Sequence, residues 1–300
     1  MMEAALWLFD AVISGLLTAI GALPFEAVEA GFIRRALLTV LLVAPVCGMV
    51  GVYVVNFRMA FFSDAISHSA FAGVALGFLA VSAGLAWVDP RLTLVALAIV
   101  VGLLITAAKR RTELGTDTII GVAFAGVMAL GIAIIRFDPR FQRDFASFLY
   151  GDVLTVDQAD LRIALLLAIC VSVFMTIAYN RLLLVGLNLD LARTRGVATR
   201  AYDYLFAVLV VLVVTATIRI SGLLLVTALL VVPAATARNL ARSAGQVLWY
   251  AAGAGVLAGV GGLVVSIGYN IAASAAIILI GVALFGLSLG FRADWGRSAR

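Results

Sequence analysis

The stretch ALLTVLLVAPVCGMVGVYVVN, residues 36–56, carries no charged side chain. A helix needs about 20 predominantly apolar residues to cross the hydrocarbon core of a bilayer. This stretch is long enough and apolar enough to form such a span. Blocks of similar character recur along the chain at residues 9–24, 65–87, 91–108, 118–136, 161–182, 204–237, 247–268 and 272–291.

The composition of the whole chain also indicates a membrane protein. Hydrophobic residues make up 64% of the 300 residues and charged residues 12%, and the mean hydropathy is +1.17. Soluble domains are about half apolar and about a quarter charged. We therefore predict an all-α, multi-pass transmembrane bundle that forms a single domain over residues 1–300. The first residues lack a basic region and a small-residue cleavage site, so we expect no cleavable signal peptide.

The apolar block 204–237 is too long for one straight span. It is interrupted at Arg219, Ser221 and Gly222. We predict one helix, a tight turn and a second, short or re-entrant, helix, which gives about nine or ten membrane segments in total. Irregular backbone at that depth requires protein neighbours rather than lipid.

The basic residues indicate an orientation rather than a nucleic-acid partner. The formal net charge is +5, but the arginines sit in short loops between apolar blocks instead of one patch. Cytoplasmic loops of membrane proteins carry the excess of basic residues. This rule places on the cytoplasmic side the loops near residues 58, 109–111, 181–200, 238–242 and 292–300. Both termini then face the cytoplasm.

Two connecting segments are longer than a hairpin needs. Residues 137–160 are polar and aromatic and fall on the external side in this topology. Residues 183–203 form a cytoplasmic loop with a helix-like middle, LDLARTRG. A short amphipathic helix in such a loop could dock a soluble partner. A solvated connector is the alternative interpretation.

Cysteines and glycines point to packing rather than chemistry. Cys47 and Cys170 lie in separate apolar blocks without a second cysteine or a histidine nearby, which predicts buried structural thiols and not a zinc cluster. Glycines four residues apart let helices approach closely in lipid. Such pairs occur at Gly73 with Gly77, Gly255 with Gly259, and Gly286 with Gly290.

One acid and the single histidine of the chain lie at the start of the block 65–87. Asp64 and His68 are four residues apart and therefore share one face of a helix. Carboxylate oxygen and imidazole nitrogen bind zinc, and the same mixture suits manganese or ferrous iron. Two ligands are too few for a closed structural site, but they suit an ion that must leave again. The alternative is an Asp–His pair that only tethers the helix end.

The chain lacks the features of an energy-converting enzyme. A P-loop needs GxxxxGK[ST], and the only lysine, Lys109, follows Ala108 and has Leu103 where the first glycine should be. One histidine without an evident triad gives no support to hydrolytic catalysis. If ATP powers this protein, the ATPase is a separate chain.

Three stretches in order resemble the zinc/manganese/iron ABC transporter permeases, the ABC-3 family. They are FRMAFFSDAISHSAFAGVALGF at residues 57–78, GDVLTVDQADL at 151–161 and SGLLLVTALLVVPAATAR at 221–238. The resemblance implies a permease in the cytoplasmic membrane of a prokaryote. It implies three kinds of protein partner: two cytoplasmic P-loop ATPases, an extracytoplasmic solute-binding protein and a second permease subunit, identical or paralogous.

The same resemblance implies roles for individual residues. Asp64 and His68 correspond to the intramembrane ligands of the transported zinc, manganese or iron(II) ion, which passes without a permanently bound cofactor. The segment DLARTRG falls where such permeases carry the helix that couples to the ATPase. Its candidate coupling residues are Asp190, Leu191, Ala192, Arg193 and Gly196.

Three alternatives remain from the sequence. An ABC permease for cobalamin or an iron chelate needs a wide cavity and no close acid–imidazole pair. A proton- or ion-coupled secondary carrier would use Asp64 and His68 as a proton relay, and it predicts inverted internal repeats, which are not evident. In a membrane scaffold that transports nothing, the Asp–His pair would be incidental.

Overall fold

The computed structural model describes residues 2–21, 30–85, 87–135 and 153–298, and these residues form helices joined by short connections. The chain order is α1 (Met2–Gly21), α2 (Gly31–Asn56), α3 (Phe62–Ser82), α4 (Pro90–Arg111), α5 (Thr116–Ile135), η2 (Val153–Thr155), α7 (Gln158–Leu187), α8 (Leu189–Thr194), α9 (Thr199–Ser221), α10 (Leu223–Leu240), α11 (Ala244–Tyr269) and α12 (Ala273–Ser298). The described part of the chain contains no strand.

The prediction of an all-helical membrane bundle is confirmed. Within the described ranges, nine helices are long and apolar enough to cross a membrane: α2, α3, α4, α5, α7, α9, α10, α11 and α12. A backbone in lipid must satisfy its own hydrogen bonds, and a helix does this within a single segment. Runs of apolar residues therefore locate the spans well.

The long apolar block 204–237 divides at Gly222, close to where the sequence predicts a turn. Gly222 has a φ of 80°, a left-handed conformation that residues with a Cβ adopt only with strain. Helix α9 ends at Ser221 and α10 begins at Leu223. Both pieces are among the nine candidate spans, so the second helix is long enough to cross.

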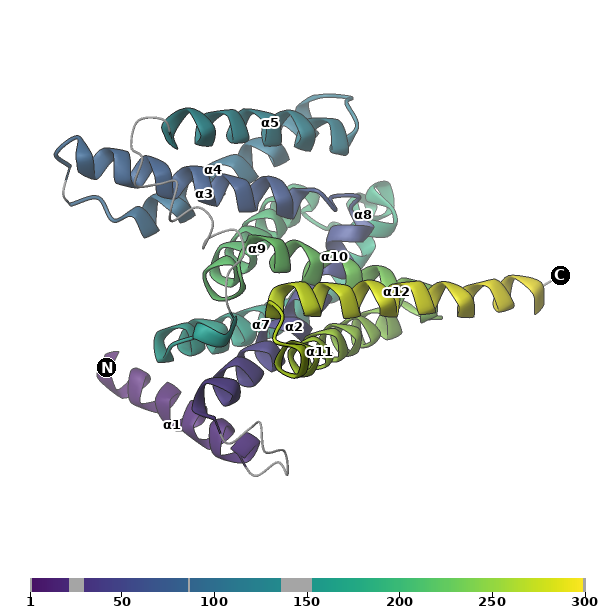
Figure 1. Cartoon of the computed structure of the whole chain (residues 1–300). Helices are drawn as coiled ribbons and strands as arrows, with labels where there is room; N and C mark the ends of the chain where they lie inside the picture. The colour runs from purple at the N-terminus through teal and green to yellow at the C-terminus, as the bar shows by residue number, and fades with distance from the viewer. Residues whose placement is uncertain (1, 22–29, 86, 136–152, 299–300) are drawn as a thin grey trace.

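The bundle is arranged in groups that Figure 1 makes visible. Helices α3, α4 and α5 pack together along one side, with α9 against α4. Helix α2 lies in the interior, in contact with α7, α10 and α11, and α12 covers α10 and α11.

Two of the three predicted glycine pairs lie at close helix contacts. A Cβ added to Gly73 would lie 2.7 Å from the Leu94 Cα of α4, and one added to Gly255 would lie 2.7 Å from the Ala44 carbonyl oxygen of α2. The third pair makes no such contact within the described part of this chain, because a Cβ on Gly286 or on Gly290 would meet no described atom within 4 Å.

Helix α1 is not among the nine candidate spans, and its apolar stretch covers only Phe9–Gly21. The Arg162 guanidinium donates to both Asp10 carboxylate oxygens at 2.7 Å, which fixes α1 beside the beginning of α7. At its other end, Gly21 lies against Arg34, near the beginning of α2.

The two long connections are shorter than the sequence predicts. Helix α7 begins after Asp157, whose carboxylate accepts from the Asp160 backbone in a capping box, so the polar segment ends at 157 rather than 160. Residues 136–152 lie outside the described part. Apolar residues 183–187 continue α7, and α9 starts at Thr199, so only residues 188–198 connect the two helices and not 183–203.

Candidate metal site

The turn between α2 and α3 positions Asp64 and His68. Helix α2 ends at Asn56, Arg58 adopts a left-handed φ of 54°, and α3 begins at Phe62. Asp64 therefore lies in the first turn of α3, where the helix dipole favours a negative charge. His68 follows one turn later on the same face.

The Asp64 and His68 side chains are half-buried, although most residues around them in this turn of α3 are buried in the bundle. Ser67 and Ser69, on either side of His68, are fully buried. The Asp64 and His68 side chains are near enough to interact electrostatically. The structure thus brings the two predicted ligands together on a partly accessible face of a packed helix.

Two residues from other helices complete the surroundings of this pair. Phe124 of α5 meets the His68 ring edge-to-face, with centroids 5.0 Å apart and planes at 86°. The Thr227 hydroxyl of α10 is in range of the Asp64 carboxylate, while it donates to the Leu224 carbonyl oxygen at 3.1 Å. No sequence spacing could reveal either residue, because each lies on a helix far along the chain.

The pair is an open site. Among the described residues, no group of three or more His, Cys, Asp or Glu side chains could hold a metal ion. His68 Nδ1 is buried and has no hydrogen-bond partner in the described part of the chain. In the part of the chain that the structure describes, the pair therefore offers one carboxylate and one imidazole as candidate donors.

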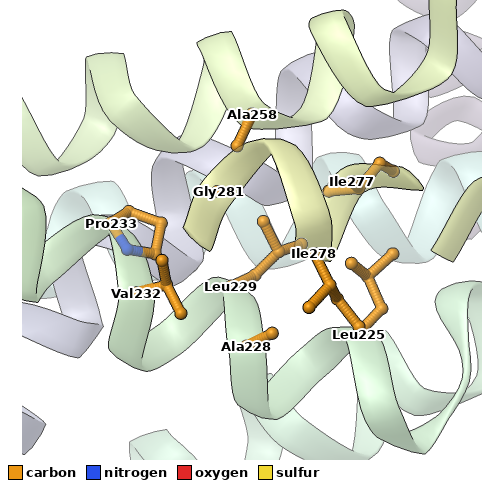
Figure 2. A pocket seen from close by; sticks show the side chains of 9 residues that line it. All are labelled: Leu225, Ala228, Leu229, Val232, Pro233, Ala258, Ile277, Ile278 and Gly281. Atoms are coloured by element: carbon orange, nitrogen blue, oxygen red, sulfur yellow. The ribbon is translucent and has the colours of Figure 1, made fainter. Parts of the chain in front are cut away.

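An apolar hollow lies elsewhere in the bundle, between α10, α11 and α12 (Figure 2). Its cavity volume is only about 10 Å³, and it is lined by Leu225, Ala228, Leu229, Val232, Pro233, Ala258, Ile277, Ile278 and Gly281. None of these side chains carries an oxygen, nitrogen or sulfur atom. The hollow offers nothing to a hydrated cation and is distinct from the site on α3.

The segment predicted to couple with an ATPase forms the short helix α8. The Asn188 side chain caps it by accepting from the backbone N–H groups of Asp190 and Leu191 at 3.0 Å. Gly196, with a φ of 73°, lies just beyond its end. Ala192 is fully buried, whereas Leu191 is 46% exposed.

Polar contacts hold the helices around α8 together. Arg110 at the end of α4 pairs with Asp203 at the beginning of α9. The Arg181 guanidinium of α7 donates to the Tyr202 hydroxyl at 2.6 Å. Helix α8 is therefore connected on both sides to helices that are tied to one another.

The comparison with known families decides the classification. A family model described as the ABC 3 transport family matches residues 29–292. The chain belongs to this family. Its membership makes the protein a transport component without a catalytic domain, and it confirms the resemblance seen in the sequence.

Individual relatives cover most of the chain. The high-affinity zinc uptake system membrane protein ZnuB of Haemophilus influenzae is 29% identical, over 85% of this chain and 95% of that protein. The manganese import system permease protein ScaB of Streptococcus gordonii is 32% identical, over 85% of this chain and 89% of that protein.

Solved structures confirm the architecture. The structure of PsaBC from Streptococcus pneumoniae in complex with Fab matches with a TM-score of 0.74 and 29% identity, over 89% of this chain and 92% of that chain. An ABC transporter in an inward-facing conformation matches with a TM-score of 0.68 at 19% identity, over 96% of this chain. The second likeness concerns the fold alone.

The cysteine prediction for this ABC-3 protein holds at one position and fails at the other. Cys47 is buried in α2 as predicted. Cys170 is exposed on the outer surface of α7, so the prediction of a buried thiol is wrong there. Cys170 lies in an apolar block because the exposed surface of α7 is suited to lipid. The sequence alone cannot distinguish a lipid-facing surface from the protein interior.

Proposed function

We propose that this protein is the permease subunit of an ABC importer that carries zinc or manganese across a bacterial membrane, and that Asp64 and His68 are the ligands the ion meets on its way. Family membership and the zinc and manganese relatives support the transport of a divalent metal. The observation that carries the proposal is the half-buried acid–imidazole pair on one face of α3.

The chemistry of the pair suits an ion in transit. Carboxylate and imidazole together bind Zn²⁺ or Mn²⁺ without the soft sulfur ligands that would retain zinc or copper. Two ligands from one subunit leave the ion under-coordinated, so water or a second permease subunit must supply the remainder. Weak, incomplete coordination lets the ion leave after it enters.

The importer requires partners that this chain does not contain. We propose that cytoplasmic ATPase subunits dock on α8 and that an extracytoplasmic binding protein delivers the metal on the opposite side. The exposed apolar side chains of Leu189 and Leu191, on a helix of only six residues, support the docking role. Asp190 and Arg193 form an exposed ion pair beside them at 3.4 Å.

Replacing Leu191 with aspartate should separate the permease from its ATPase. A charge in the apolar part of a docking surface is costly to bury, so the co-purified ATPase should fall about tenfold or more. The measurement is the amount of ATPase recovered with the purified permease. Leu114→Asp, an equally apolar exposed position in the α4–α5 connection, is the control and should retain the ATPase. Equal recovery for wild type and Leu191→Asp would contradict docking on α8.

The function itself is tested by uptake into vesicles that contain the permease and its ATPase. Zinc or manganese should accumulate only with ATP and the binding protein, and a protonophore should not stop it. Accumulation that needs a proton gradient and no ATP would support the secondary-carrier alternative instead.

A further inference from the structure

His68 is held in an unusual way for a metal-binding histidine. Such histidines almost always donate their second ring N–H to a carboxylate, a carbonyl or a water molecule, which fixes the tautomer and makes the ring a stronger ligand. Here Nδ1 is buried and has no such partner among the described residues. The contact that the structure does provide is an aromatic one, the Phe124 ring at 5.0 Å.

The position of Phe124 is set by the packing of α5 on α3. Farther along the same two helices, Gly131 of α5 lies against the Phe71 ring of α3. A Cβ added to Gly131 would lie 3.5 Å from the ring carbons. On the opposite face of α5, the Val122 side chain is exposed. Helix α5 therefore presents Phe124 inward at the level of His68.

We propose that Phe124 is a positioning residue for the metal-binding imidazole, which it orients through an edge-to-face contact. This inference rests on the proposed role of His68 as a ligand of the transported ion. The ring is then placed with Nε2 toward the ion, and its basicity stays low. An oriented but weak ligand captures an ion and releases it readily.

The inference predicts that two substitutions of Phe124 change the affinity for zinc in opposite directions. Phe124→Leu removes the aromatic edge, so the imidazole loses its preferred orientation and zinc binds more weakly. Phe124→Gln brings an amide oxygen beside the ring, which can accept from the second ring N–H and strengthen the ligand. Because a missing partner of this kind costs about 10–100-fold in metal affinity, the gain should be about tenfold. A residue that only packs the helices would reduce affinity, or leave it unchanged, in both variants.

The test is zinc titration of the purified, full-length permease in lipid nanodiscs, by calorimetry. Val122→Gln is the matched control, because it adds the same amide to the exposed face of α5 and should leave zinc affinity unchanged. The gain in Phe124→Gln should vanish when His68→Ala is added. A monodisperse peak in size-exclusion chromatography establishes that each variant is folded. If Phe124→Gln does not fold, Phe124→Leu is compared with the wild type instead.

The outcomes separate this inference from the proposed function. If His68→Ala weakens zinc binding but both Phe124 variants bind like the wild type, the positioning role is wrong and the ligand role stands. If both Phe124 variants weaken binding equally, Phe124 is a packing residue. If His68→Ala leaves zinc binding unchanged, His68 is not a ligand and the positioning role fails with it.

Discussion

Asp64→Asn and His68→Ala should each reduce ATP-driven metal uptake about 100-fold or more, since even the loss of a residue that supports a ligand costs about 10–100-fold in metal affinity. Asparagine keeps the shape of the side chain but removes the negative charge that a divalent ion requires. Alanine removes the imidazole altogether. The measurement is the initial rate of zinc and of manganese uptake into vesicles that contain the permease with its ATPase.

Asp117, an acid on the adjacent helix α5, provides the matched control for Asp64→Asn. Asp117 lies in the first turn of α5, as Asp64 lies in the first turn of α3, but its side chain is exposed. Asp117→Asn should transport metal at the rate of the wild type. If the Asp–His pair only tethers the end of α3, the Asp64 and His68 variants will lose thermal stability and still transport metal. That result would remove both residues from the pathway.

Gly51→Ala should produce the largest loss of stability from a single methyl group. Gly51 lies in the C-terminal part of α2, and a Cβ there would overlap the Leu230 carbonyl oxygen of α10. The obstacle is backbone, which cannot move aside as a flexible side chain can. Overpacking of this kind costs about 3 kcal/mol or more, which corresponds to a fall in Tm of roughly 6–12 °C.

Gly253→Ala provides the comparison. Gly253 is an exposed glycine inside α11, and a Cβ there would meet no described atom within 4 Å. Alanine is the better helix former by about 1 kcal/mol, so this variant should be as stable as the wild type or slightly more so. The melting temperatures of Gly51→Ala and Gly253→Ala are measured by thermal unfolding in the same detergent. Equal melting temperatures for Gly51→Ala and the wild type would mean that α2 and α10 are not packed as closely as described.

Much of the fold could be predicted because a bilayer permits few solutions. Uncharged runs such as residues 36–56 must be helical in lipid, and the structure places them so. The break near Gly222 could be predicted because glycine tolerates the backbone conformation that the turn requires. These features depend on local residues and on length alone.

The position of α1 could not be predicted, because it depends on a contact between residues far apart in the sequence. Residues 9–24 are apolar enough to suggest a span, but Asp10 finds its partner in Arg162, 152 positions along the chain. Hydropathy does not record such a partner. The contact between α1 and α7 could therefore not be predicted from the sequence.

The candidate site was predictable in part. Helical spacing alone places Asp64 and His68 on one face, and the structure agrees. Phe124 and Thr227 come from α5 and α10, and only tertiary packing brings them to the pair. The exposure of Cys170 was equally hidden, since lipid and protein interior select similar apolar side chains.

The most direct test of the central claim is zinc K-edge X-ray absorption of the purified permease, prepared with an affinity tag that contains no histidine. Because His68 is the single histidine of the chain, any imidazole signal from a bound ion must come from it. We predict nitrogen and oxygen ligands at about 2.0–2.2 Å with imidazole scattering that disappears in His68→Ala. Sulfur scattering at about 2.3 Å, or an identical spectrum in the variant, would contradict the account.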